Sequence, residues 1–189
     1  MADITLKWAD DALKKFERQI VQLQTQFPKV LPQEINKTGD KAKTVVIRTL
    51  TKQTGLDRRV IVAAVGNPSQ ARPGKLTYDM KTRGGNIRLK YLKPKETEDG
   101  VVAKPFGVTT EYPGAFMKGG AFPNRTPVPE WNGHVMRRIN SRGTRITFAR
   151  SGVIIPQEMT AGATAEAFQK VAAPLLQARV EKVIKKLLG

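Results

Sequence analysis

The sequence predicts an α+β fold, with N-terminal and C-terminal helices around a small antiparallel β-sheet. Apolar residues recur every three or four positions at both ends of the chain and alternate with polar residues in the middle. The composition, 40% hydrophobic and 26% charged among 189 residues, is typical of a globular protein. We expect a single α+β domain, 1–189, with a helical N-terminal region (1–66), a β-rich region (75–160) and a final helix (163–188).

The first helix is predicted by an apolar stripe whose members stand three, four or seven residues apart. Its members are Leu6, Leu13, Phe16, Ile20, Leu23 and Phe27. We expect the helix to end before Pro28, because proline lacks the N–H that a helix needs. We assign the stripe to a contact between subunits, with packing on the protein's own core as the alternative.

Two further helices are predicted before the chain changes period. The second begins near Pro32 and stops at Gly55; Gly39 inside it lowers helix stability by about 1 kcal/mol relative to alanine, which indicates a bend or a close approach of another segment. Asp57 has the position of an N-cap and opens a short helix, 58–65.

A β-hairpin with one basic, solvated face is predicted next. Residues 76–80 and 87–91 each alternate apolar and polar side chains, and Arg83-Gly84-Gly85-Asn86 between them has turn composition. Tyr78 and Tyr91 fall on the apolar face of this hairpin. We therefore expect both rings to pack in the core and not to stack on nucleic-acid bases.

Further strands are predicted towards the C-terminal side. Asp99-Gly100 marks a tight turn, and a short strand is expected at 115–117. Residues 119–133 contain three prolines and are expected to form a long functional or mobile loop. Strands are expected at 134–139 and 145–150.

The charge balance predicts an anionic partner. The chain has 33 Lys and Arg against 16 Asp and Glu, a formal net charge of +17. Such a charge attracts polyanions and keeps copies of the chain apart. Fifteen of the basic residues lie between Lys37 and Lys95, where only three acidic residues stand, and five arginines cluster between Arg137 and Arg150.

The basic residues are the predicted contacts to nucleic acid or to an acidic partner. They are Lys37, Lys41, Lys43, Arg48, Lys52, Arg58, Arg59, Arg83, Arg88, Lys90, Arg137, Arg138, Arg142 and Arg145. The alternative is a basic face that merely meets solvent. The sequence contains no zinc finger, no basic zipper and no aromatic RNA-binding signature, so any contact with DNA is expected to be independent of sequence.

Enzyme chemistry finds little support in the sequence. There is no cysteine, and the single histidine, His134, has no second metal-ligand residue at a suitable spacing and is expected on a solvent-exposed strand. Phosphate-loop, nucleophile-elbow and dinucleotide fingerprints are absent. We expect no catalytic residue, no cofactor and no metal. The longest apolar run, 60–65, is far shorter than a bilayer span, so no membrane contact is expected.

An ordered set of short segments resembles a known family. The segments are Ile35-Asn36-Lys37-Thr38, Lys41-Ala42-Lys43-Thr44, Gln53-Thr54-Gly55-Leu56, Pro113-Gly114-Ala115-Phe116, Gly133-His134-Val135 with Arg137, and Ile154-Ile155-Pro156. Their order and spacing are similar to those of the minor tail protein Z family of long-tailed bacteriophages and prophages, which includes tail completion proteins. The resemblance extends from Ile35 to the final helix.

This resemblance implies a non-enzymatic structural protein of the virion. It implies a tail completion or neck protein at the head-proximal end of the tail, present in the host cytoplasm during assembly, which aids head-tail joining and positions the DNA. The implied partners are copies of the same chain in a ring, expected to be a hexamer, and other phage tail and head-connector proteins. The alternative from the residues alone is a free, basic nucleic-acid-binding protein of α+β type.

Overall fold

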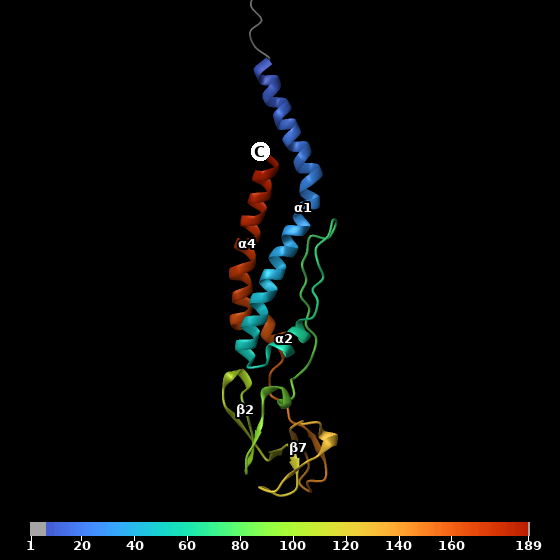
Figure 1. Ribbon diagram of the computed structural model, residues 1–189, viewed down its shortest axis with the longest axis vertical. Coiled ribbons are helices and arrows are strands. Elements are labelled where there is room, and N and C mark those ends of the chain that lie inside the picture. The colour runs from blue at the N-terminus through green and yellow to red at the C-terminus, as the bar shows by residue number, and fades with distance from the viewer. Residues whose placement is uncertain (1–6, 189) are drawn as a thin grey trace, which may run out of the picture. The chain divides into compact units, whose positions relative to one another are not determined.

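The computed structural model describes the backbone of residues 7–188 and the side chains of residues 14, 15 and 17–188. The fold is α+β: long helices come first and last in the chain, with small antiparallel sheets between them (Figure 1). The chain forms two compact units. The helical unit comprises Met1–Lys43, Pro68–Asp79 and Gln169–Gly189, and the sheet unit comprises Thr44–Asn67 and Met80–Phe168. The single-domain organisation stays a prediction.

The first helix, α1 (Lys7–Thr54), is continuous, so the expected break between Pro28 and Pro32 is wrong. A proline inside a helix destabilises it by about 3 kcal/mol. Packing offsets this loss: within the helical unit α1 lies beside the last helix, α4 (Gly162–Leu188), and Arg179 of α4 pairs with Glu34 of α1 at 2.7 Å (Figure 1). The two prolines stand four residues apart, so both missing donors lie on one side of α1.

The short helix α2 (Arg58–Val65) has the predicted bounds. Asp57 is its N-cap residue, but its carboxylate makes no capping hydrogen bond and pairs with Lys93 Nζ at 2.7 Å. Gly66 ends the helix in the left-handed region, and its N–H donates to the carbonyl of Val62. The local signals of cap and stop were sufficient to place this helix.

The predicted hairpin of 76–80 with 87–91 is wrong. The first half lies in the helical unit, where Ser69 and Asp79 exchange backbone hydrogen bonds, and the second half forms the 3-10 helix η1 (Leu89–Leu92) in the sheet unit. Tyr91 is 43% exposed, which contradicts its expected core position. Contacts with segments distant in sequence override the local alternation.

The segment Pro68–Asp79 is held on α1 by two specific contacts. The Asn36 amide donates to the carbonyl of Ala71 at 2.9 Å and accepts from its N–H at 2.7 Å. Tyr78 donates to Asp40 at 2.8 Å, and its ring lies against the backbone of Gly39. The close approach expected at Gly39 is confirmed.

The strands are short and form three antiparallel sheets in the described part of the chain. The sheets have the orders β1-β2-β3, β4-β7-β8 and β5-β6. The strands are β1 (Lys95–Glu96), β2 (Gly100–Ala103), β3 (Thr110–Pro113), β4 (Ala115–Phe116), β5 (Lys118–Gly119), β6 (Thr126–Pro127), β7 (Met136–Arg138) and β8 (Ile146–Phe148). The remaining elements are the 3-10 helices η2 (Pro105–Gly107) and η3 (Pro129–Trp131) and the helix α3 (Ile155–Thr160).

Several expected strands are confirmed with shorter bounds. The strand at 115–117 is β4, and the pair expected at 134–139 and 145–150 is the β7-β8 hairpin, whose turn is closed by the Gly143 N–H bonded to Asn140. The expected loop at 119–133 contains β6 and η3, so some of it is ordered into secondary structure. The helix α3 was not expected.

The hydrophobic core lies within the sheet unit. It joins the end of α1, α2, η1, the sheets and α3, with fully buried Leu50, Leu56, Ile61, Leu89 and Val153 among its members. Each such side chain contributes about 1.5–3 kcal/mol by leaving water. In the helical unit the buried apolar side chains among the described residues are small ones, Ala42, Ala71 and Pro32. The two units therefore differ sharply in how much apolar surface they bury.

Candidate polyanion-binding surface

One face of the β4-β7-β8 sheet carries a row of three apolar side chains. The register pairs Phe116 with Met136 and Met136 with Phe148, so these residues stand directly opposite one another across the three strands. Side chains alternate between faces along a strand, so His134 and Arg138 fall on the same face as Met136, and Arg150 on the same face as Phe148. This face therefore combines aromatic and cationic residues.

Two arginines cover the ends of the row. The guanidinium carbon of Arg88 lies 3.9 Å from the ring centre of Phe148, and that of Arg138 lies 5.1 Å from the ring centre of Phe116. A guanidinium is attracted to the face of an aromatic ring and keeps its N–H groups at its edge. The rings thus hold both arginines in place while leaving donors for an anion.

His134 joins this arrangement at the Phe148 end. Its ring centre lies 4.8 Å from that of Phe148, and its Nε2 lies 3.4 Å from Arg88 Nη1. Burial, together with the positive charges of Lys90 and Arg88, lowers the pKa of His134. An arginine can only donate, so Nε2 accepts and Nδ1 carries the proton of the neutral ring. That Nδ1–H is buried without an acceptor among the described residues.

Two more cations stand beside Arg88. Arg88 and Arg150 form an antiparallel backbone bridge, Arg150 Nη1 donates to the carbonyl of Asn86 at 2.8 Å, and Lys90 Nζ donates to the carbonyl of Asn132. We call Arg88, Lys90, His134, Arg138 and Arg150 the arginine face. None of its arginines or its lysine has an ion-pair partner among the described residues, so their charges are available to an anionic partner.

A cavity of about 330 Å³ borders the arginine face at Arg138 and Phe116. Trp131 packs edge-on against Phe116 with ring centres 5.3 Å apart, and Lys118 and Arg125 contribute two further cations to the wall. Arg125 forms an ion pair with Glu96, with Nη1 2.8 Å from Oε1. The carboxylates of Glu98 and Asp99 also line this cavity, so its charge is mixed. The arginine face itself is the more uniformly cationic surface.

The structure brings together three of the predicted contact residues, Arg88, Lys90 and Arg138. Arg137 and Arg145 lie on the opposite face of the same sheet, and Arg142 is exposed in the β7-β8 turn. Arg58 and Arg59 are exposed on α2, and Arg83 is exposed before η1. The predicted residues of the sheet unit thus occupy several surfaces.

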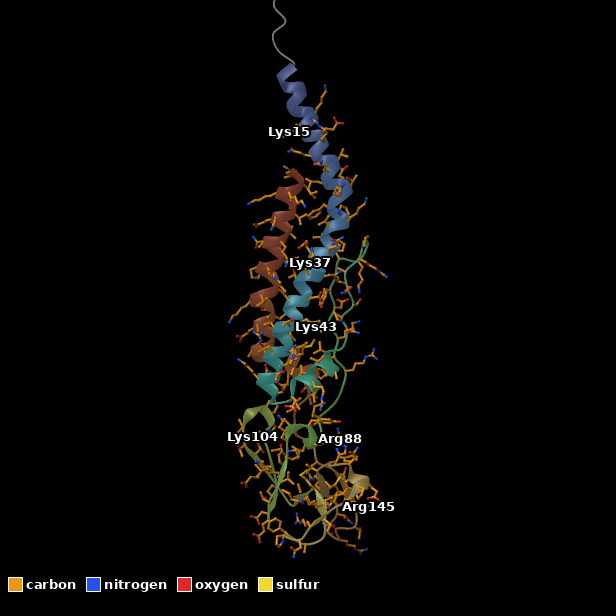
Figure 2. All side chains as sticks on the ribbon, viewed as in Figure 1. Lys15, Lys37, Lys43, Arg88, Lys104 and Arg145 are labelled. Carbon is orange, nitrogen blue, oxygen red and sulfur yellow. The ribbon has the colours of Figure 1, made fainter. Side chains whose placement is uncertain are left out.

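The predicted contacts on α1 divide between the two units. Arg48 and Lys52 are exposed one helical turn apart in the sheet unit, and Lys37, Lys41 and Lys43 belong to the helical unit. Lys37 pairs with Glu34 at 2.7 Å. Figure 2 shows Lys37 and Lys43 on α1 and Arg88 and Arg145 in the sheet unit.

Sequence reasoning missed the role of His134 and left Arg150 out of the contact residues. His134 was expected to be solvent-exposed; it is half-buried, because Phe148 and Arg88 pack on it. The sequence did contain a signal for this shared surface, because residues two apart in a strand lie on the same face. That spacing joins His134, Met136 and Arg138 in one strand and Phe148 and Arg150 in the next. The aromatic partners of the arginines could not be read from this spacing.

The apolar stripe assigned to subunit contacts is only partly described. Leu6, and the side chains of Leu13 and Phe16, lie outside the described residues. Ile20 is 54% exposed, and Leu23 and Phe27 are half-buried in the helical unit. The described portion of the stripe therefore retains apolar surface.

Comparisons with known proteins add no relative: no protein-family model, no curated protein and no solved structure matches the chain. Within the described residues, no cluster of three or more acidic or histidine side chains could hold a metal ion. In residues 7–188, no helix has the combined length and apolarity of a bilayer span.

Proposed function

We propose that the chain is a non-enzymatic structural protein of a bacteriophage virion, a tail completion or neck protein at the head-proximal end of the tail. It aids head-tail joining and positions the DNA. The observation that carries the proposal is the arginine face, whose cations have no carboxylate partner among the described residues and two of which, Arg88 and Arg138, lie on aromatic rings.

The chemistry of the arginine face suits a repeating anion. Fixed guanidinium groups lose little conformational entropy on binding and make paired hydrogen bonds to phosphate or carboxylate oxygens. Because the sequence contains no zinc finger, basic zipper or aromatic RNA-binding signature, we take the contact to depend on charge and spacing and not on base sequence. A DNA end or an acidic neighbouring protein provides such an anion.

The proposed partners are further copies of the chain in a ring, which we take to be a hexamer, and other tail and head-connector proteins. The sequence resemblance to the minor tail protein Z family supports this assignment. The half-exposed apolar residues of the helical unit support association of copies. Cationic copies that lie close together need an anion to offset their repulsion, and DNA or an acidic ring supplies it.

Deletion of the gene from the phage or prophage that encodes the chain tests the assignment. We expect separate DNA-filled heads and unattached tails by electron microscopy, and a labelled chain at the head-proximal end of complete particles. Complete particles in the absence of the chain would overturn the proposal. An Arg88→Gln/Arg138→Gln variant should reduce the yield of joined particles, whereas Lys81→Gln/Lys104→Gln, with equal charge loss away from the arginine face, should not.

The second candidate is a free nucleic-acid-binding protein. The observation that favours it is that the arginine face lies within the sheet unit of a single copy and needs no second chain to assemble. Duplex DNA binding by the monomer, with no association with tails or heads in the same lysate, would favour this candidate over the first.

A further inference from the structure

The cavity beside the arginine face carries charges of both signs that have no ion-pair partner among the described residues. They are two exposed cations and two exposed carboxylates, Lys118, Arg138, Glu98 and Asp99. A third cation of the wall, Arg125, is already neutralised by its ion pair. A ligand with only one sign of charge would be repelled by half of these groups. The complementary ligand therefore combines an anionic part with a part that is rich in N–H donors.

The same cavity has an aromatic wall and the size of a small ligand. Phe116 and Trp131 meet there edge to face, and Trp131 is only half-buried. The volume of about 330 Å³ lies at the lower end of the roughly 300–1,000 Å³ that small-ligand pockets span. Much of the remaining wall is backbone, because four of the lining residues are glycines: Gly100, Gly114, Gly119 and Gly120. A flat ring with polar edges suits these walls.

A nucleotide that is not base-paired has all the parts that the cavity asks for. The face of its base stacks on aromatic side chains, and the amino group of the base donates to a carboxylate. Its phosphate takes the cations. A free amino acid also carries both signs of charge, so the surroundings of the cavity have to decide between the two ligands.

The arginine face favours the nucleotide. Arg138 belongs both to the arginine face and to the cavity wall, so the two surfaces are continuous. Phe148, at the far end of the arginine face, lies two strand spacings from Phe116, which is about 10 Å. A nucleic-acid strand that leaves the cavity brings a further phosphate with each nucleotide along this row, whereas a single amino acid leaves the arginine face empty.

We propose that the cavity binds one unpaired base of single-stranded DNA and that the arginine face holds the phosphates that follow this base. The inference rests on the DNA contact of the proposed function and names the form of DNA that this part of the molecule takes. A base inside a duplex is excluded, because its pairing edge is occupied and its faces are stacked. The contact with duplex DNA stays independent of base sequence, while the cavity selects a base by its amino group.

Two strands of equal charge test this selection. Cytosine presents an amino donor at the position where thymine presents a carbonyl acceptor. We expect the full chain to bind oligodeoxycytidylate of about 12 nucleotides, a usual length for a single-strand site, more tightly than oligothymidylate of the same length. The ratio of the two dissociation constants, measured by fluorescence anisotropy, should be about fivefold or more. Equal affinities would overturn the proposal.

Removal of the carboxylates separates base recognition from general attraction. Glu98→Ala/Asp99→Ala takes away two negative charges, so a surface that merely attracts phosphate would bind both strands more tightly and by the same factor. On the proposal the cytosine strand loses its acceptors, and the ratio of the two dissociation constants falls towards one. Glu111→Ala/Glu130→Ala removes the same charge at exposed positions outside the cavity lining and should leave the ratio unchanged. An unchanged ratio in the cavity variant would contradict the proposal.

Trp131 reports where the strand lies. The chain has two tryptophans, so Trp8→Phe leaves Trp131 as the single source of tryptophan fluorescence. The cytosine strand should change this fluorescence on binding, because its base lies against the indole, whereas a duplex should leave it unaltered. An unaltered signal at saturation with the cytosine strand would place the strand elsewhere and overturn the cavity as its site.

These measurements keep the inference separate from the proposed function. Absence of binding by single strands and duplex alike at low salt would overturn both the cavity site and the DNA contact of the proposed function. Duplex binding without a preference for cytosine and without a response of Trp131 would overturn the cavity site alone. A preference for cytosine in a chain whose deletion leaves complete particles would support the cavity site and overturn the role in head-tail joining.

Discussion

Gly39 lies in α1 beneath the ring of Tyr78, so close that a Cβ there would come within 2.4 Å of two ring atoms. The nearest atoms include Cγ, at the base of the ring, which cannot swing away without moving Tyr78 as a whole. The residue that weakens the helix intrinsically is therefore the one that allows Tyr78 to pack and to bond Asp40.

We expect Gly39→Ala to lower the free energy of unfolding by about 1–3 kcal/mol, although alanine favours a helix by about 1 kcal/mol over glycine. Chemical denaturation followed by circular dichroism measures the change. In a Tyr78→Ala background the same substitution should become neutral or stabilising. A loss of equal size in both backgrounds would show that the Tyr78 ring is not the cause.

His134 makes stability depend on pH. Its pKa is lowered in the folded protein, so between the folded pKa and the ordinary value near 6.5 the unfolded chain binds more protons. The contribution of neutral His134 to the free energy of unfolding is therefore complete above about pH 6.5. It is lost as the pH falls through that value towards the pKa of the folded protein. Protonation also removes the acceptor for Arg88.

Thermal unfolding between about pH 5.5 and 7.5 tests this dependence. The unaltered chain should lose melting temperature as the pH falls, and His134→Gln should show a flatter profile, because glutamine keeps an acceptor and does not titrate. The lowered pKa of Glu34 gives a loss that begins only below its ordinary value near 4.5, outside this range. Parallel profiles would contradict the assignment to His134.

At the scale of elements, α1 is the clearest case of packing overriding local preference. Pro28 is exposed and Pro32 is buried, and the helix continues through both. The contact that supports it here joins Glu34 to Arg179 of α4, a residue far outside the sequence window that a local rule examines.

Pro28→Ala should stabilise the chain, by up to about 3 kcal/mol, because it restores one backbone donor at an exposed position in a helix interior. The melting temperature measures the effect. Pro73→Ala, in an exposed position outside the helices, serves as the matched control and should change it little. A lower stability for Pro28→Ala would indicate that the proline is needed for the path of α1.

At the scale of the whole molecule, positive charge is spread over both units. The sheet unit carries 18 basic residues against 8 acidic ones, and the helical unit 15 against 8. Most of these charges are exposed and are screened by salt within about 10 Å at 0.1 M. On the proposed function, we expect the total charge to set how strongly an anion is attracted and the arginine face to set where the anion is held.

Binding of duplex DNA should weaken steeply with salt, with a logarithmic slope of about −0.9 per phosphate neutralised. Arg88→Gln/Arg138→Gln should reduce the size of that slope by about 1–2 units, measured by fluorescence anisotropy over a salt series. Lys81→Gln/Lys104→Gln should reduce it less. Equal reductions would mean that basic residues over the whole surface contribute alike to DNA binding and that the arginine face has no special role.

The sequence predicted the elements whose signals are local. The N-cap at Asp57 and the stop at Gly66 defined α2, and turn residues at 140–143 defined the β7-β8 hairpin. For the candidate surface, it named Arg88, Lys90 and Arg138 among the predicted contacts, which stay predictions, but not the phenylalanines on which two of them lie. Those partners come from strands distant in the sequence, and no local pattern connects them.

The sequence by itself determined the α+β class, the helices at both ends and the large positive charge. Periodicity and turn residues are local signals, and the net charge is the sum of the charges of the individual residues. Only the tertiary structure decided that α1 runs through its prolines, that residues 76–91 form no hairpin, and which arginines lie on aromatic rings. The physical reason is that each of these outcomes depends on the energy of contact between segments far apart in the chain, which outweighs the local preference of either segment alone.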